Sequence, residues 1–196
     1  MTVNRMVAVC GSRKPAPGVE GRSAARELLR AVCAGATEAG ATPEWLDLRD
    51  LDIPLFDGRG AEQFPDSDLS RAAKQIAAAD VVLLSVPAYW GGPAGVVKNF
   101  LDLLGGPAYD APPDTPPPLD GKVFALLVVG ADQVSAPAAQ AAMRLTLASM
   151  GAWVAPRCEM VADPRTLRNV GQLLARLKDF GGYVAALTPP VRGAAR

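Results

Sequence analysis

Histidine is absent from the 196-residue sequence. Without histidine, Ser-His-Asp and Cys-His catalytic arrangements are excluded, and so are metal sites with histidine ligands. Any reaction must therefore depend on carboxylates, lysine, tyrosine, backbone groups or a cofactor that supplies the chemistry itself.

Cysteine is also scarce. The three cysteines, Cys10, Cys33 and Cys158, are odd in number and far apart, and no two of them form a CxxC pair. This spacing does not fit a disulfide framework or a zinc site. We therefore expect three buried structural thiols and no metal site.

Long apolar runs and an excess of one charge are missing too. Lys and Arg number 20, as do Asp and Glu, so the formal net charge is zero and no basic patch indicates a nucleic-acid partner. No apolar run is long enough to cross a bilayer. The run that ends at Cys10-Gly11 is too short for the core of a signal peptide and fits a first strand. The sequence therefore predicts a cytoplasmic protein with no membrane partner.

Apolar residues make up 49% of the chain, which is enough for a substantial core. Short apolar runs alternate with longer segments of helical period, a pattern typical of a parallel sheet covered by helices on both faces. Strands are predicted at 6–10, 44–48, 81–86 and 123–129, with a short fifth strand within 152–161 that breaks at Pro156. Helices are predicted at 23–39, 69–79, 93–104, 136–150 and 164–187, the last weakened at Gly181-Gly182.

This alternation predicts a three-layer α/β sandwich with a five-stranded parallel sheet in the order 2-1-3-4-5. Residues 1–188 are predicted to form one domain, and residues 189–196 a disordered tail. The proline-rich segment 107–119 is expected to be an extended loop with no packed structure of its own.

In such a sheet, ligands bind beyond the carboxyl ends of the strands, at the switch point between the first and third strands. The loop at 11–23 follows the first strand and leads into a helix, where backbone N–H groups and the helix dipole favour an anion. Arg13 or Arg22 could grip a phosphate there. The alternative is that Ser23 only caps the helix and the cations are solvated.

The second loop at this switch point, 87–92, reads PAYWGG. Its two aromatic residues could flank a flat ligand, while its two glycines let the edge of that ligand approach the backbone. The alternative is a turn whose aromatic residues fill the core or a subunit interface.

The longer stretch PAYWGGPAGVVKNFLD, residues 87–102, resembles the flavin-loop signature of the NADPH-dependent FMN reductase family. The segment DLRDLDIPLFD, residues 47–57, and the Gly11-Ser12-Arg13 turn with the later Ser23 agree with the same family. The three separated motifs come in the right order, and the likeness continues through Met143-Arg144 and Gly151-Ala152, so it covers nearly the whole chain.

The resemblance implies a flavodoxin-like fold that binds FMN. Ser12, Arg13 and Ser23 would contact the FMN phosphate, together with Arg22. The isoalloxazine would lie against residues of the second loop, namely Pro87, Ala88, Tyr89, Trp90, Gly91 and Gly92. Gly130 and Ala131 would approach the far edge of the flavin, and Lys98, Asn99 and Asp102 would fix the loop and its helix.

The resemblance further implies an oxidoreductase in which hydride passes from NADPH or NADH through the flavin to a small acceptor, such as a quinone or free flavin. The flavin N5 carries the chemistry, so no catalytic side chain is expected. A flavin-dependent monooxygenase is a candidate partner, and a homodimer or homotetramer is expected. The alternatives are a flavodoxin-like electron carrier, which the zero net charge argues against, and a fold relative that no longer binds flavin.

Three positions depart from many relatives. Ala88 and Trp90 replace a glutamate and a polar residue, which makes the flavin pocket more apolar or adds an aromatic wall above the ring. The Gly130-Ala131 pair stands where many relatives have two glycines, which puts the contacts of this loop in doubt.

Overall fold

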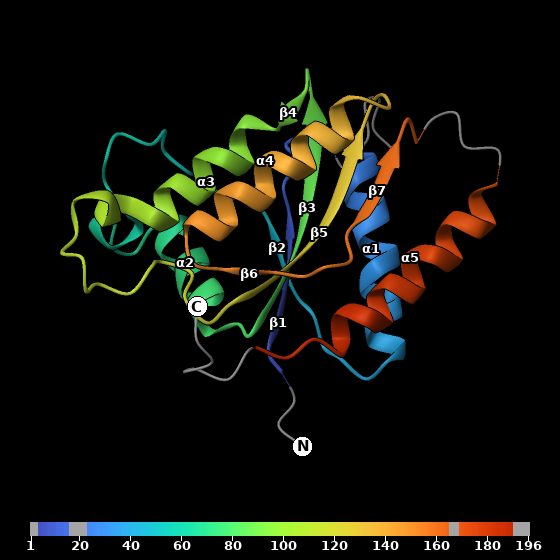
Figure 1. Ribbon diagram of the computed structural model, residues 1–196, viewed down its shortest axis with the longest axis horizontal. Coiled ribbons are helices and arrows are strands. Elements are labelled where there is room, and N and C mark those ends of the chain that lie inside the picture. Colours follow the sequence, from blue (N-terminus) through green and yellow to red (C-terminus); the bar gives the residue numbers. More distant parts are fainter. Residues whose placement is uncertain (1–3, 16–22, 165–168, 190–196) are drawn as a thin grey trace.

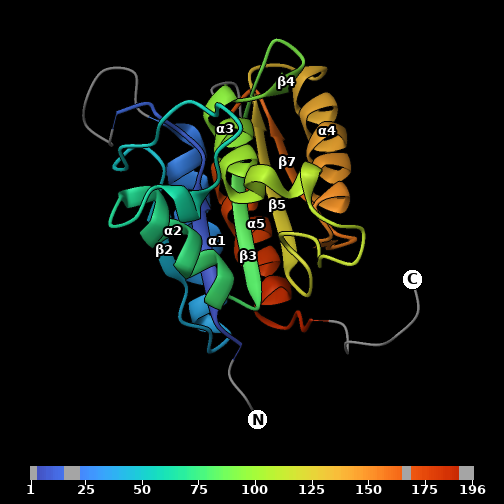
Figure 2. The same cartoon turned by 90° about the vertical axis from the view of Figure 1, so that its left-hand side faces the viewer.

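Parallel strands form a central sheet with helices on both of its faces (Figures 1 and 2). The computed structural model describes residues 4–15, 23–164 and 169–189. The strands lie in the order β2 (Glu44–Asp47), β1 (Met6–Cys10), β3 (Val81–Tyr89), β5 (Val123–Gly130) and β6 (Trp153–Val154). A further strand, β7 (Glu159–Ala162), also pairs with β5 in parallel, and β4 (Gly92–Pro93) pairs antiparallel with β3.

This strand order confirms the prediction. Because β4 is only the second arm of a hairpin, the five parallel positions follow the chain as 2-1-3-4-5. The fifth position is divided, since β6 pairs with the first residues of β5 and β7 pairs with its last four. Pro156 lies between β6 and β7, where the absence of its N–H breaks no pairing.

Among the described residues, five α-helices cover the sheet. On one face lie α1 (Ala24–Glu38) and α5 (Val170–Ala185), and on the other lie α2 (Asp68–Ala78), α3 (Gly95–Gly105) and α4 (Ser135–Ser149). Short 3-10 helices occupy Ala61–Gln63 (η1) and Gly106–Asp110 (η2). No helix in these described ranges combines the length and the apolar character that crossing a membrane requires.

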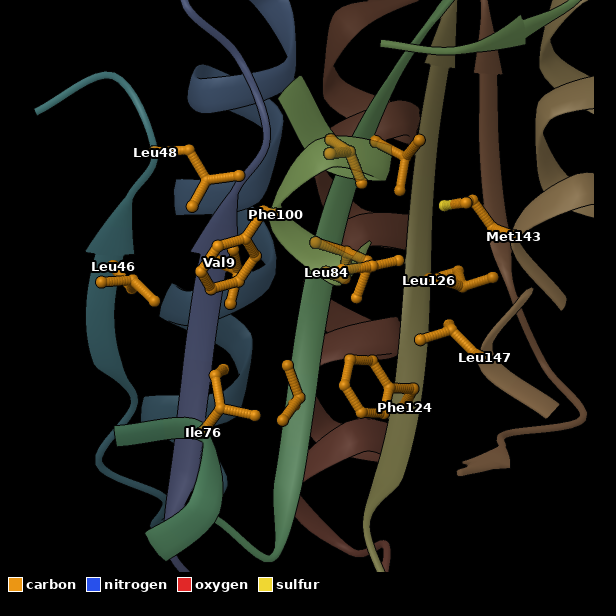
Figure 3. Close-up of a cluster of buried hydrophobic side chains, with 14 of the residues drawn as sticks. Val9, Leu46, Leu48, Ile76, Leu84, Phe100, Phe124, Leu126, Met143 and Leu147 are labelled. Atoms are coloured by element: carbon orange, nitrogen blue, oxygen red, sulfur yellow. The ribbon is translucent and has the colours of Figure 1, made fainter. Parts of the chain in front are cut away.

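Alternate residues of the central strands supply two separate cores. Val9, Leu84 and Leu126 point toward α2, α3 and α4, where Phe100 and Met143 pack against them (Figure 3). The residues between them on the same strands point toward α1 and α5. Because both faces are buried, the strands are unbroken apolar runs in the sequence. These runs allow the strands to be predicted from the sequence.

Two predicted segments need correction. β3 extends three residues past the expected end at 86, because Ala88 and Tyr89 pair with β4. The segment 107–119 does have packed structure, since it begins within η2 and ends on Leu119, which is buried and donates its N–H to the Met150 carbonyl at 2.9 Å. Residues 165–168 of the predicted last helix and 190–196 of the predicted tail lie outside the described residues.

The expected weakness of the last helix at its glycine pair is wrong, because α5 runs through Gly181 and Gly182 without interruption. Gly181 lies against the backbone of α1, and a Cβ at this position would collide with the Val32 carbonyl. A Cβ on Gly35 of α1 would collide in turn with the Lys178 carbonyl of α5. These glycines let the backbones of α1 and α5 touch.

The two adjacent glycines of α5 give a matched pair for testing this contact. Gly181→Ala should lower the free energy of unfolding by about 2 kcal/mol or more, because the new methyl must push two helix backbones apart. Gly182→Ala should be neutral or stabilising by up to about 1 kcal/mol, because nothing lies near its Cβ and alanine is the better helix former. Urea unfolding of both variants measures the difference, and equal stabilities would contradict the contact.

Candidate functional site

A cavity of about 400 Å³ opens at the carboxyl ends of β1 and β3. Residues 11–14, which follow β1, form one side, and Pro87 and Tyr89 of β3 form another. Residues 94–96, at the start of α3, complete the lining. The structure thus brings Ser12 and Arg13 of the first predicted loop together with Pro87 and Tyr89 of the second.

The first loop presents an amide group suited to an anion. Within the described part of the chain, the backbone N–H of Arg13 has no hydrogen-bond acceptor, whereas the Ser12 N–H donates to the Cys10 sulfur. The Ser12 hydroxyl is buried and accepts from the Lys14 N–H at 3.3 Å. Unpaired amide groups beside a helix N-terminus are the donors that phosphate groups bind.

The serine and arginine candidates of this loop take different places. Ser23 caps α1, with its Oγ accepting from the Arg26 N–H at 3.2 Å, and its own O–H remains able to donate. Arg13 donates from Nη1 to the carbonyls of Leu48 and Leu51 at 3.3 and 3.4 Å. Arg22 lies outside the described residues.

A buried arginine that the sequence analysis did not select lies beneath this loop. Arg26, in the first turn of α1, is only 2% exposed and forms a two-pronged pair with Asp47 at the end of β2, at 2.6 and 3.1 Å. The hydrogen bond to Asp47 raises the pKa of Arg26, so the guanidinium stays charged. Its sequence signal is weak, because a charged residue near the start of an amphipathic helix usually faces solvent.

The second loop is a tight hairpin that projects beyond the sheet (Figure 2). Its two central residues, Trp90 and Gly91, have φ of +52° and +77°, the left-handed backbone of a type I′ turn. Tryptophan in this conformation costs about 1–2 kcal/mol. The Trp90 side chain is fully exposed, at 101%, whereas Tyr89 reaches the cavity and has the Lys14 ammonium 5.6 Å from its ring centre.

The start of α4 anchors this hairpin. The Ser135 hydroxyl accepts from the Gly91 N–H at 3.3 Å and donates to the Asp132 carboxylate at 2.9 Å. Asp132 also accepts the backbone N–H groups of Val134 and Ser135, and these hydrogen bonds lower its pKa. The strained turn is therefore fixed in place.

The remaining predicted flavin contacts do not line the cavity. Ala88 is buried within the sheet and pairs with Gly130 of β5, which packs against Ala136. Ala131 is exposed beyond the end of β5. Trp90, Gly91 and Gly92 belong to the hairpin outside the lining, so any contact they make with a flavin requires the ligand to extend past the cavity.

The helix that follows the hairpin is fixed by polar contacts. Asn99 accepts from the Phe56 N–H and donates to the Pro54 carbonyl, both at 2.8 Å, which ties segment 54–56 to α3. Lys98 pairs with Asp102 one turn later at 2.6 Å. The bonds thus fix α3, as the resemblance implies, but none of them reaches the loop at 87–92.

A larger cavity, of about 510 Å³, lies between the C-terminal halves of α3 and α4 and the proline-rich segment. It is away from the carboxyl ends of β1 and β3, and its charged residues, Lys98 and Asp102, neutralise each other. The smaller cavity has the unpaired Arg13 amide group and the topological position that a nucleotide needs.

A helix-covered parallel sheet with such a cavity at its switch point defines the flavodoxin-like class of nucleotide-binding α/β proteins. Residues 4–165 match the sequence model of the NADPH-dependent FMN reductases, and the chain belongs to this family. It is an oxidoreductase that uses FMN with NAD(P)H as co-substrate.

Solved structures agree with the fold. An NADH:FMN oxidoreductase in its apo form has a TM-score of 0.71 at 20% identity, over 93% of this chain and 88% of that chain. An azoreductase from Bacillus anthracis str. Sterne has a TM-score of 0.64 at 19% identity, over 93% and 98%. A flavodoxin, WrbA-like protein from Agrobacterium tumefaciens has a TM-score of 0.63 at 18% identity, over 93% and 95%. No curated protein sequence matches the chain.

Of the three thiols that the sequence predicts to be buried, Cys10 is buried, whereas Cys33 and Cys158 are only half-buried. All three should still be unreactive in the folded protein. Burial raises the pKa of Cys10 and Cys158 to about 11 and that of Cys33 to about 12, so all three stay protonated at pH 8. We expect iodoacetamide to alkylate the native thiols about 100-fold more slowly than those of the unfolded chain, as counted by mass spectrometry.

The same pKa shifts set a pH dependence. Thiols of the unfolded chain ionise from about pH 9, before those of the folded chain, so stability should fall as pH rises above this value. One thiol that iodoacetamide alkylates rapidly in the native protein would contradict the expected low reactivity of the three cysteines.

Proposed function

We propose that FMN binds in the cavity at the carboxyl ends of β1 and β3. The Arg13 N–H is the observation that carries this proposal, because it has no acceptor among the described residues and lies at the cavity beside the N-terminus of α1, where a phosphate binds. The buried Ser12 hydroxyl lies in the same lining. Ser23 and Arg22 complete the phosphate contacts. Pro87, Tyr89 and the amide groups at the start of α3 lie on the side where the isoalloxazine would rest.

When bound, FMN supplies a ring system that accepts hydride from a nicotinamide and passes electrons on to an acceptor. The residues of this chain bind and orient; none is needed to move a proton. Lys14 and Arg13 are exposed cations at the cavity, where they attract the phosphates of NADPH or NADH. The nicotinamide and the acceptor then use the same open side in turn, which gives ping-pong kinetics.

The finer parts of the proposal concern the partners. We infer a small acceptor, such as a quinone or free flavin, and supply of reduced flavin to a flavin-dependent monooxygenase as one use of the activity. The protein would act in the cytoplasm as a homodimer or homotetramer. Light scattering of the purified protein measures this oligomeric state. The structural similarity to an NADH:FMN oxidoreductase and to an azoreductase supports small acceptors.

Flavin absorbance tests the function directly. We expect the purified protein to bind FMN and its visible absorbance to bleach on anaerobic addition of NADPH or NADH, without any other protein. A bound flavin that neither nucleotide reduces would instead indicate an electron carrier. A colourless protein that does not quench the fluorescence of added FMN would show that the cavity serves another ligand.

The exposed Trp90 should select the acceptor rather than hold the flavin. Trp90→Asn removes the indole at the rim and relaxes the turn, because asparagine tolerates positive φ. We expect stability to rise by up to about 1 kcal/mol, FMN affinity to change less than about threefold, and kcat/KM for a bulky quinone to change about tenfold.

The control for Trp90 is Val134→Ala, which shortens another exposed side chain in the loop before α4. It should leave the stability, the FMN affinity and kcat/KM for the quinone unchanged. A large loss of FMN affinity in Trp90→Asn would show that the indole covers the isoalloxazine itself.

A further inference from the structure

The hydrogen bonds of Arg26 are complete. A guanidinium has five N–H donors. Nε and Nη2 donate to the two Asp47 carboxylate oxygens, and Nη2 also donates to the Ser12 carbonyl at 2.9 Å. Nη1 donates to the carbonyls of Lys14 and Pro15 at 2.8 and 3.1 Å. No donor remains for a ligand, and the paired carboxylate cancels the charge.

Three of these five bonds hold the backbone of the first loop. In a planar trans peptide the C=O and the following N–H point in opposite directions. Because the Ser12 carbonyl points at the buried guanidinium, the N–H of Arg13 must point away from it. That N–H belongs to the cavity lining and has no acceptor among the described residues. Arg26 therefore sets the direction of a donor without touching the ligand.

Asp47 fixes the guanidinium in turn. It is 7% exposed, lies at the end of β2 and also accepts the Arg49 N–H at 3.1 Å. A lysine at position 26 would offer a single point charge with three donors in place of the planar fork, so it could not hold this carboxylate and the loop carbonyls together.

We propose that Arg26, locked by Asp47, is a positioning residue that makes the cavity select FMN over riboflavin by aiming the Arg13 N–H at the phosphate. The inference rests on the proposed function, because it takes FMN as the ligand of this cavity. It assigns the phosphate preference to a group that makes no contact with the phosphate.

The test compares FMN and riboflavin, which differ only in the phosphate. Dissociation constants for both are measured by quenching of flavin fluorescence in the wild-type protein and in Arg26→Lys. We expect the variant to lose about 10- to 100-fold in FMN affinity, the range of a lost charge-assisted donor set, and less than about threefold in riboflavin affinity. If Arg26 only stabilised the fold, Arg26→Lys would weaken the binding of FMN and of riboflavin alike.

Arg30→Lys is the matched control, since Arg30 lies one turn further along α1, is exposed and has its guanidinium 5.6 Å from the Trp45 ring centre. It should keep the FMN-to-riboflavin ratio of the wild type. If Arg26→Lys fails to fold, the double variant Arg26→Met with Asp47→Leu removes the pair without leaving an unpaired buried charge, and it should show the same selective loss.

A measurement on the wild-type protein needs no variant. Hydrogen exchange of the Arg13 amide should slow when FMN is added and stay unchanged with riboflavin. An unprotected Arg13 amide, or an unchanged affinity ratio in the Arg26 variants, would overturn the positioning role. A wild-type protein that binds both flavins equally would also overturn it while the flavin function stands, whereas one that binds neither would refute the proposed function itself.

Discussion

The parallel pairing of β1 with β3 is the constraint on which the rest of the site depends. Their register joins Met6 to Val81 and Cys10 to Ser85, so both strands end at the same edge. One more hydrogen bond, from the Gly11 N–H to the Ser85 carbonyl at 2.9 Å, carries the contact into the first loop. Gly11 is required there, because a Cβ would collide with that carbonyl and with Val97.

The two faces of the sheet then place the other parts of the cavity. Helix α1 follows the first loop and covers one face, while α3 follows the hairpin and covers the opposite face. Their N-termini therefore approach the cavity from opposite sides of the sheet. The first loop follows β1, and the buried Arg26–Asp47 pair beneath it joins the start of α1 to the end of β2. Three consecutive elements, β1, α1 and β2, therefore meet at this loop.

Most of the fold could be predicted from the sequence because both faces of the central strands are buried. Apolar runs marked β1, β3 and β5, and helical spacing marked the helices between them. The hairpin at β4 escaped prediction because its turn has tryptophan where asparagine or glycine is usual. The sequence predicts a weak point at Gly181 because it does not show the backbone of α1 beside this glycine.

The candidate site was predictable in position but only partly in its residues. Topology located the edge, and the motifs selected Ser12, Arg13, Pro87 and Tyr89, which line the cavity. The sequence does not single out Arg26, because its role depends on a partner twenty-one positions later, at the end of strand β2. Neither hydrophobic periodicity nor a local motif indicates such a pairing. In addition, a lone charged residue in a helix usually faces solvent.

The missing histidines and the raised thiol pKa values together have a consequence for the kinetics. The chain has no imidazole, the side chain that usually titrates near neutral pH, and burial raises the pKa of Cys10 and Cys158 to about 11 and that of Cys33 to about 12. A change in rate between pH 6 and 8 would therefore not come from an imidazole or a thiol of this chain, and the reacting molecules become the first place to look for its source.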